Sequence, residues 1–161
     1  MEHLDYTNEN DNSSILEEKK GPEMFISLEE WAALEEKAES TFWGFLGCKV
    51  VSITAEETVI SLEVGPHHMN MLGIVNGGVS SSLLDNSMGM MAGALRPNYN
   101  MVTSNLNIHF VAPLKGSVIT THAKVLHGSK RTLTCYAEVR EADGTVGAIG
   151  TATFRGVKKQ D

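Results

Sequence analysis

The chain has 161 residues, of which 42% are hydrophobic and 20% are charged, which fits one soluble globular domain with enough material for a core. Its formal net charge of −7 argues against a nucleic acid or an anionic membrane as the main partner. The two cysteines lack zinc or redox spacing, and the polar, acidic N-terminus lacks the pattern of a signal peptide. A cytoplasmic protein with reduced thiols is therefore expected.

The first 24 residues are polar and acidic, and they predict a mobile arm ahead of a single domain over residues 25–157. A helix is predicted next, because Ser27 and Glu30 have the spacing of a capping box and apolar residues recur at helical intervals as far as Phe42. Two glycines are expected to end this helix, Gly44 and Gly47.

Alternating apolar and polar residues predict strands over 48–54, 57–64, 101–111, 117–127, 132–140 and 145–155. Turn residues separate the last four, and Asp143-Gly144 is the strongest hairpin signal. Short turns between four consecutive strands predict an antiparallel meander. In the first of these four strands, the alternation predicts a shared apolar face for Val102, Ser104, Leu106, Ile108 and Phe110.

The segment GIVNGGVSSSLLDNSMGMMAGAL, residues 73–95, predicts a helix from residue 78 to 95, because no proline interrupts it. Most of its side chains are small, so other elements are expected to approach it closely. An antiparallel sheet wrapped around one central helix is an α+β architecture. Asp85 is the only charged residue of the segment, and an unpaired carboxylate is expensive to bury.

The segment PHHMNMLGIVNGG, from Pro66 to Gly78, followed by Asp85, resembles the motif of hotdog-fold thioesterases of the phenylacetate-pathway (PaaI-like) type. The positions that match in register are Pro66, His68, Asn70, Gly73, Gly77, Gly78 and Asp85. The resemblance covers roughly residues 45–156 and implies the hotdog fold, an antiparallel sheet around a long central helix. It also implies a homodimer or a pair of dimers that acts on acyl-CoA without a metal or redox cofactor. One departure is Asn76, where the family usually has His.

Thioester hydrolysis needs a base that deprotonates water or a carboxylate that attacks the carbonyl carbon, and Asp85 is the candidate for either role. The alternative is a solvated carboxylate, or one paired with a cation such as Arg96 across a subunit contact. The first amides of a helix lack internal partners, and the resemblance implies that the Gly77 N–H binds the thioester oxygen. The alternative for Gly77 and Gly78 is a tight turn that requires a positive φ.

Two asparagines and a threonine complete the catalytic candidates. Asn76 either caps the helix or donates its side-chain amide to the thioester oxygen or a water, in place of the family His. Asn70 either positions Asp85 or the water, as the resemblance implies, or satisfies backbone groups of its loop. Thr103 falls where related enzymes carry a Ser or Thr that holds the water or carboxylate, with an ordinary strand threonine as the alternative. By resemblance, one subunit supplies Asn70, Asn76 and Gly77, and its partner supplies Asp85 and Thr103.

Five residues are candidates for substrate binding: Gly78, His68, Met88, Lys130 and Arg131. Met88 belongs to a methionine-rich set that fits either core packing or a pliable acyl pocket. Lys130 and Arg131, in the turn GSKR, either meet the phosphates of CoA or form a solvated hairpin tip. His68 follows His67, and adjacent side chains point apart, so no metal site is predicted; His68 is expected to order the turn.

The sequence therefore predicts an acyl-CoA thioesterase that releases a carboxylic acid and CoA. A non-catalytic protein that binds or senses acyl-CoA or an acyl carrier is the alternative, favoured by Asn76 in place of His. A scaffold built on the hotdog dimer would leave Asp85 without a purpose. A hotdog dehydratase is disfavoured, because its usual His/Asp pairing is not evident.

Overall fold

The computed structural model describes residues 28–159, so the predicted arm and the predicted helix cap at Ser27 lie outside the described residues. The helices are α1 (Leu28–Glu39), α2 (Phe42–Leu46), the 3-10 helix η1 (Pro66–His68) and α3 (Gly77–Leu95). The strands are β1 (Cys48–Ile53), β2 (Thr58–Glu63), β3 (Tyr99–Phe110), β4 (Val118–Gly128), β5 (Thr132–Glu141) and β6 (Val146–Lys158). Within residues 28–159, none of the helices has the length and apolar character needed to cross a membrane.

The six strands form one antiparallel sheet in the spatial order β1-β2-β4-β5-β6-β3. Strands β4, β5 and β6 form the expected meander, but β3 lies beside β6 at the edge opposite β1. The predicted four-stranded meander is therefore wrong at its first strand. The reason is that α3 carries the chain across the sheet from β2 to the far edge, and a loop containing Pro113 then returns the chain to β4.

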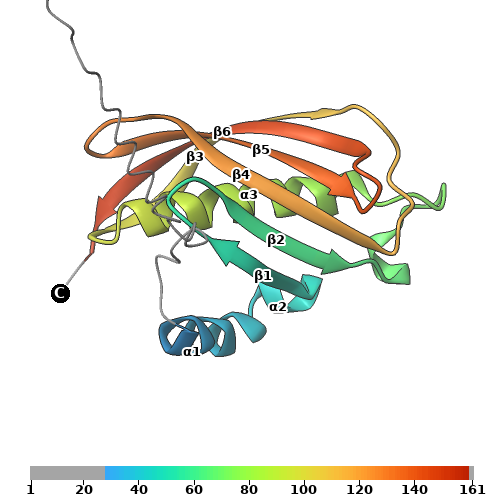
Figure 1. Cartoon of the computed structure of the whole chain (residues 1–161), viewed down its shortest axis with the longest axis horizontal. Helices are drawn as coiled ribbons and strands as arrows, with labels where there is room; N and C mark the ends of the chain where they lie inside the picture. The colour runs from blue at the N-terminus through green and yellow to red at the C-terminus, as the bar shows by residue number, and fades with distance from the viewer. Residues whose placement is uncertain (1–27, 160–161) are drawn as a thin grey trace, which may run out of the picture.

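The sheet curves around α3, which contacts every strand (Figure 1). The large side chains that are fully buried there include Ile60, Leu62, Leu83, Leu84, Met88, Met91, Ile119, Leu133, Val139 and Phe154. Each such burial stabilises the fold by about 1.5–3 kcal/mol. A Cβ added to Gly89 of α3 would lie 3.3 Å from Phe154 Cε1, which confirms that small residues on the helix permit close approach. The predicted α+β hotdog architecture is confirmed.

Strand β3 contains a β-bulge. Thr103 pairs with Phe154 of β6, but the next paired residue is Asn105, which lies opposite Thr153. Ser104 is therefore an extra residue on β3 without a partner of its own. An extra residue shifts a period-two pattern by one position, so it exchanges the two faces of the strand on one side of the bulge.

The bulge corrects the predicted face of β3. Leu106 and Ile108 pack against the core as predicted. Before the bulge, however, Met101 packs against the core, and Val102 is 46% exposed. The assignment of Val102 and Ser104 to the apolar face is therefore wrong. The shift also turns Thr103 toward α3.

The first predicted helix is two helices rather than one. α1 ends at Glu39, where Thr41 Oγ1 donates a hydrogen bond to Ala38 O at 2.6 Å and competes with continuation of the helix. The expected stop at Gly47 is confirmed, since Gly47 has a φ of 74° and caps α2. Gly44 lies inside α2 instead of ending a helix; a Cβ there would meet Glu39 O, so glycine permits the close crossing.

The hairpin predicted at Asp143-Gly144 is confirmed, and it joins β5 to β6. Gly144 has a φ of 89°, a left-handed conformation that favours glycine. The Asp143 carboxylate accepts a hydrogen bond from Thr145 N at 2.8 Å, and this bond lowers the pKa of Asp143.

Candidate active site

His68 anchors the loop that leads into α3. The residue is only 2% exposed, its Nδ1 accepts a hydrogen bond from Gly65 N at 2.9 Å, and its Nε2 lies 2.9 Å from Leu46 O. A neutral ring with its proton on Nε2 makes both bonds. Burial, and secondarily the charge of His67, lowers the pKa of His68. Both ring nitrogens therefore serve to hold this loop against the end of α2.

Asn70 holds the same loop in shape. Its Oδ1 accepts hydrogen bonds from Leu72 N at 2.8 Å and Ile74 N at 3.4 Å. Asn70 therefore satisfies backbone groups of its loop, which was one of the two roles considered from the sequence. Both hydrogen bonds use the side-chain oxygen. The Nδ2 group has no acceptor among residues 28–159, so the side chain can act outside its loop only as a donor.

The tip of this loop is apolar and solvent-exposed. Met71 is 104% exposed and Leu72 is 82% exposed, beside Gly73 with a φ of 70°. An isolated β-bridge between Met69 and Val75 closes the base of the loop. The sequence analysis did not identify this apolar tip; two large apolar residues directly before a turn glycine were the available signal.

Asn76 caps α3. Its Oδ1 accepts a hydrogen bond from Gly78 N at 2.8 Å, while its backbone oxygen accepts from Val79 N and Ser80 N. The capping role is thus present, and it again leaves an Nδ2 donor. Among residues 28–159, the Gly77 amide donates to no acceptor. The N-terminal end of α3 therefore offers one unpartnered backbone N–H at the positive end of the helix dipole.

Neither Gly77 nor Gly78 has a positive φ, so the tight-turn alternative is wrong for both. A Cβ on Gly77 would instead lie 3.2 Å from both Cε1 and Cζ of Phe110. A Cβ on Gly78 would lie 3.2 Å from Asn76 Oδ1, next to the capping bond. Close neighbours, rather than backbone conformation, account for the glycines at the start of α3.

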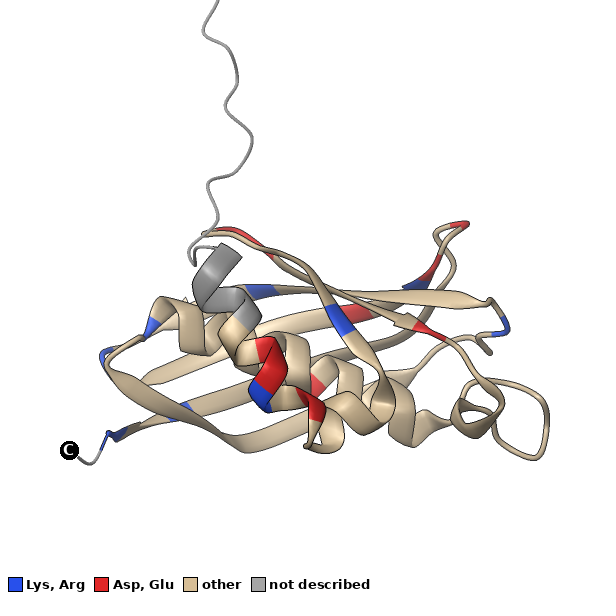
Figure 2. Ribbon diagram, turned by 90° about the horizontal axis from the view of Figure 1, so that it is seen from below, with Lys and Arg blue, Asp and Glu red and all other residues tan. Residues whose placement is uncertain are grey.

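Gly77 and Asn70 line a groove of about 360 Å³. Its other walls are mainly apolar, from Ile74, Val75, Phe110, Val111, Pro113 and Leu114. Residues 64–84 contain no Lys, Arg, Asp or Glu, and in Figure 2 the loop and the start of α3 are correspondingly tan. An N–H donor in such surroundings interacts more strongly with a developing negative charge than it would in water.

Asp85 lies half-buried on α3, where Thr103 Oγ1 donates a hydrogen bond to its Oδ1 at 2.8 Å. In the described part of the chain, no Lys, Arg or His nitrogen lies within 4.0 Å of this carboxylate. Within the chain, Arg96 donates to Leu95 O and Ser129 O. The carboxylate is therefore oriented by one hydroxyl and neutralised by no cation of residues 28–159.

The structure brings the catalytic candidates together as two groups. Asn70, Asn76 and Gly77 meet at the beginning of α3, while Asp85 and Thr103 form a pair further along it. Eight residues separate Gly77 from Asp85, which is about 12 Å along a helix. Asp85 does not line the groove at Gly77.

Three of the substrate-binding candidates belong to neither group. Met88 is fully buried in the core, whereas Met90 lines a larger groove of about 980 Å³ between α1 and the second half of α3, together with Leu34, Trp43, Ile53 and Leu95. Lys130 and Arg131 are exposed on the β4–β5 hairpin near the C-terminal end of α3. That end is about 27 Å from Gly77 along the helix.

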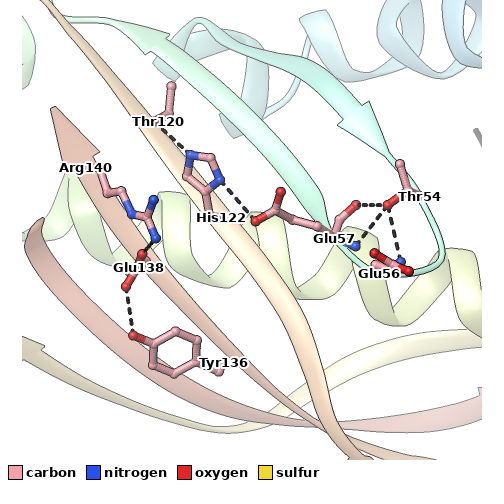
Figure 3. A network of polar contacts seen from close by, with 8 residues as sticks. All are labelled: Thr54, Glu56, Glu57, Thr120, His122, Tyr136, Glu138 and Arg140. Carbon is pink, nitrogen blue, oxygen red and sulfur yellow. Dashed lines mark hydrogen bonds and ion pairs between the residues drawn. The ribbon is translucent and has the colours of Figure 1, made fainter. Parts of the chain in front are cut away.

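A separate polar cluster occupies the face of the sheet that points away from α3 (Figure 3). His122 Nδ1 lies 3.1 Å from Glu57 Oε1, Arg140 pairs with Glu138, and Tyr136 OH donates to Glu138 Oε2 at 2.9 Å. Each of these two carboxylates lies within 4.0 Å of a His or Arg nitrogen, whereas Asp85 has only the Thr103 hydroxyl. The cluster lines a shallow groove of about 370 Å³.

The described part of the chain contains neither a cluster of metal-binding side chains nor an activated cysteine thiol. Residues 28–159 contain no group of three or more His, Cys, Asp or Glu that could hold a metal ion. Cys48 and Cys135 are unpaired and buried, and burial raises the pKa of each thiol to about 11. Neither thiol is therefore activated as a nucleophile.

Comparison with known proteins decides the family. The family model of the thioesterase superfamily matches residues 72–148, a range that includes Gly77, Asp85 and Thr103. The BH2602 protein of Bacillus halodurans, solved with CoA, is 34% identical over 61% of this chain and 70% of its own, with a TM-score of 0.59. The chain belongs to the thioesterase superfamily. Its fold is the PaaI-like hotdog fold of that superfamily.

Two further relatives agree with this membership of the thioesterase superfamily. A mutant form of the phenylacetic acid degradation protein PaaI from Thermus thermophilus is 26% identical, with 72% of this chain and 98% of that chain covered and a TM-score of 0.66. A protein of Saccharolobus solfataricus that is named as a candidate esterase is 29% identical over 119 residues, 72% of this chain and 84% of its own.

Proposed function

We propose that this thioesterase-superfamily protein is an acyl-CoA thioesterase, which hydrolyses the thioester to a carboxylic acid and free CoA. The observation that carries the proposal is the pair of unused groups on α3: the unpartnered Gly77 N–H and the Asp85 carboxylate without a cation. Thioester hydrolysis requires a donor for the developing oxyanion and a carboxylate that activates water or attacks. The relative solved with CoA supports CoA as the thiol.

In this mechanism the thioester carbonyl oxygen accepts a hydrogen bond from Gly77 N–H. The charge that develops on the oxygen is stabilised by this amide and by the positive end of the α3 dipole. The Nδ2 groups of Asn70 and Asn76 are further donors at that end of the helix, since backbone amides occupy both side-chain oxygens. Asp85 acts as the general base for water or as the nucleophile, and Thr103 orients it.

The site is proposed to be shared between two copies of the chain. About 12 Å of helix separates Gly77 from Asp85 within one chain, which is too far for both to contact one carbonyl group. Each site would combine Asn70, Asn76 and Gly77 of one subunit with Asp85 and Thr103 of the other. The 12-residue edge strand β3 supports association, because one side of it has no neighbouring strand among the described residues.

The first experiment is free-thiol release from short, long and aromatic acyl-CoAs by the wild type and Asp85→Asn. The variant should lose at least about 100-fold in kcat with its fold intact, because a positioned base contributes about 10²–10⁴-fold. Glu138→Gln, which removes the same charge from the outer face of the sheet, is the matched control and should retain activity. If the wild type binds acyl-CoA tightly but hydrolyses no thioester, the thioesterase proposal is wrong. The protein would then be a non-catalytic acyl-CoA binding protein, the alternative that Asn76 in place of His favours.

Sharing of the site is tested by mixing two inactive variants. Asp85→Asn removes the carboxylate, and Gly77→Pro removes the amide donor, so each homodimer should be inactive. After co-refolding at equal concentrations, about a quarter of wild-type activity should return, because half of the dimers are mixed and each has one intact site. Mixtures as inactive as their components would contradict a shared site.

A further inference from the structure

Phe110 is an exposed aromatic residue with an unusual position. It is the last residue of β3, its side chain is on the face toward α3, and yet the residue is 60% exposed. Its ring lines the groove of about 360 Å³ next to Gly77. Large apolar side chains left in solvent at a groove are candidates for ligand contact.

The ring is as close to Gly77 as packing permits. A Cβ at position 77 would lie 3.2 Å from both Cε1 and Cζ of Phe110, so the ring occupies the space that a larger residue at 77 would need. Gly77 and the Phe110 ring line the same groove, so a ligand that accepts a hydrogen bond from Gly77 N–H there also has the ring as a wall of its binding site.

The backbone that carries the ring is held firmly. Phe110 pairs with Ala148 of β6, and the next two amides, Val111 N and Ala112 N, both donate to Gly147 O at 2.9 and 3.2 Å. A Phe side chain has only two rotatable bonds, so a fixed backbone restricts its ring to a few staggered positions, and the structure shows the position beside Gly77. In this position the ring takes up space that a bulky substituent beside Gly77 would need.

We propose that Phe110 is a specificity-determining residue, whose ring limits the bulk of the group attached to the thioester carbonyl carbon. This inference rests on the proposed thioesterase function. With the carbonyl oxygen at Gly77 N–H, the first acyl carbon lies beside the ring. An unbranched acyl group lies flat against the ring, whereas a methyl branch on that first carbon collides with it. The protein should therefore prefer linear acyl-CoAs to isomers branched next to the carbonyl.

The test uses the linear acyl-CoA that the wild type hydrolyses fastest and its isomer with a methyl branch next to the carbonyl. Phe110→Ala should raise the kcat/KM ratio of branched to linear substrate by about tenfold or more, the scale on which one methyl group is discriminated. Phe110→Leu should give an intermediate ratio and keeps the test available if the alanine variant folds poorly. Phe110→Tyr keeps the ring and should keep the wild-type ratio.

Phe45→Ala is the control, because Phe45 is 70% exposed on α2 and stacks on Phe42 rather than lining this groove. It should leave the ratio unchanged. An active Phe110→Ala or Phe110→Leu protein with the wild-type ratio would overturn the role of Phe110 and leave the thioesterase intact. A wild type inactive on every thioester would overturn the proposed function, and the role of Phe110 with it.

Discussion

The beginning of α3 and its middle differ in the chemistry they present. At the beginning, the polar groups are donors: the Gly77 amide and the Nδ2 groups of Asn70 and Asn76. In the middle, the polar group is an acceptor, the Asp85 carboxylate, held by Thr103. The first region lies in an uncharged, largely apolar groove, and the second lies half-buried near the edge strand β3.

The difference suggests that neither region is a complete site. Donors alone can hold a carbonyl oxygen without activating water, and a carboxylate alone can activate water without stabilising the oxyanion. A single helix keeps the two regions about 12 Å apart, and in the proposed site a second copy of the chain supplies the missing region. Variants that change one region at a time can separate their contributions.

Beyond Asp85→Asn, the largest expected effect is at the donor region, from Gly77→Pro compared with Gly77→Ala. Both variants add a Cβ next to Phe110, but only proline removes the N–H. Proline is well tolerated as the first residue of a helix, and the extended backbone of Asn76 suits a residue before proline. The proline variant should have a kcat about 10²–10³-fold below that of the alanine variant, the usual loss of one oxyanion donor. Equal thiol-release rates would show that this amide has no part in the reaction.

The next effect is at the carboxylate region, from Thr103→Val. Valine has a similar shape but no hydroxyl, so Asp85 loses the bond that orients it. A hydrogen bond to a charged group contributes about 1.5–3 kcal/mol, so kcat should fall about tenfold or more. Thr103→Ser keeps the hydroxyl and should retain most of the activity. If serine and valine lower kcat equally, the hydroxyl is not the relevant group.

A smaller effect separates the two roles of Asn76. Asn76→Ala should lower the free energy of unfolding by about 1 kcal/mol in urea titrations, because the cap on Gly78 N is lost. Asn76→Asp keeps a capping oxygen and should retain stability. It lacks the Nδ2 donor, however, and so its activity should fall. An aspartate variant with full activity would restrict Asn76 to capping.

The smallest effect is a pH dependence of stability from His68, which supports the donor region. The pKa of His68 is lowered from its ordinary 6.5 in the folded protein, so the unfolded chain takes up this proton more readily. The free energy of unfolding should therefore fall as pH drops through 6.5 and level off below the folded pKa. His68→Gln should be less stable at neutral pH, but its free energy of unfolding should not show the fall that protonation of His68 causes. Urea unfolding of both proteins across this range measures the difference, and identical slopes would contradict it.

Much of the fold could be predicted from the sequence, because its signals are local. Alternation placed Leu133, Cys135 and Ala137 on the buried face of β5, and turn chemistry placed the Asp143-Gly144 hairpin. The central helix was predicted within one residue of its observed start. The order of β3 in the sheet could not be predicted, since turn residues show where a strand ends but not which strand it joins.

By itself, the sequence determined the strands, the central helix, the cap at Asn76 and an isolated carboxylate at Asp85, because these depend on residues a few positions apart. Only the tertiary structure decided that Ser104 forms a bulge, that Thr103 therefore reaches Asp85, and that the Phe110 ring lies next to Gly77. It also decided that Arg96 donates to the carbonyl groups of Leu95 and Ser129 within the chain. These contacts join residues far apart in the chain, and their geometry follows from how the sheet packs around the helix.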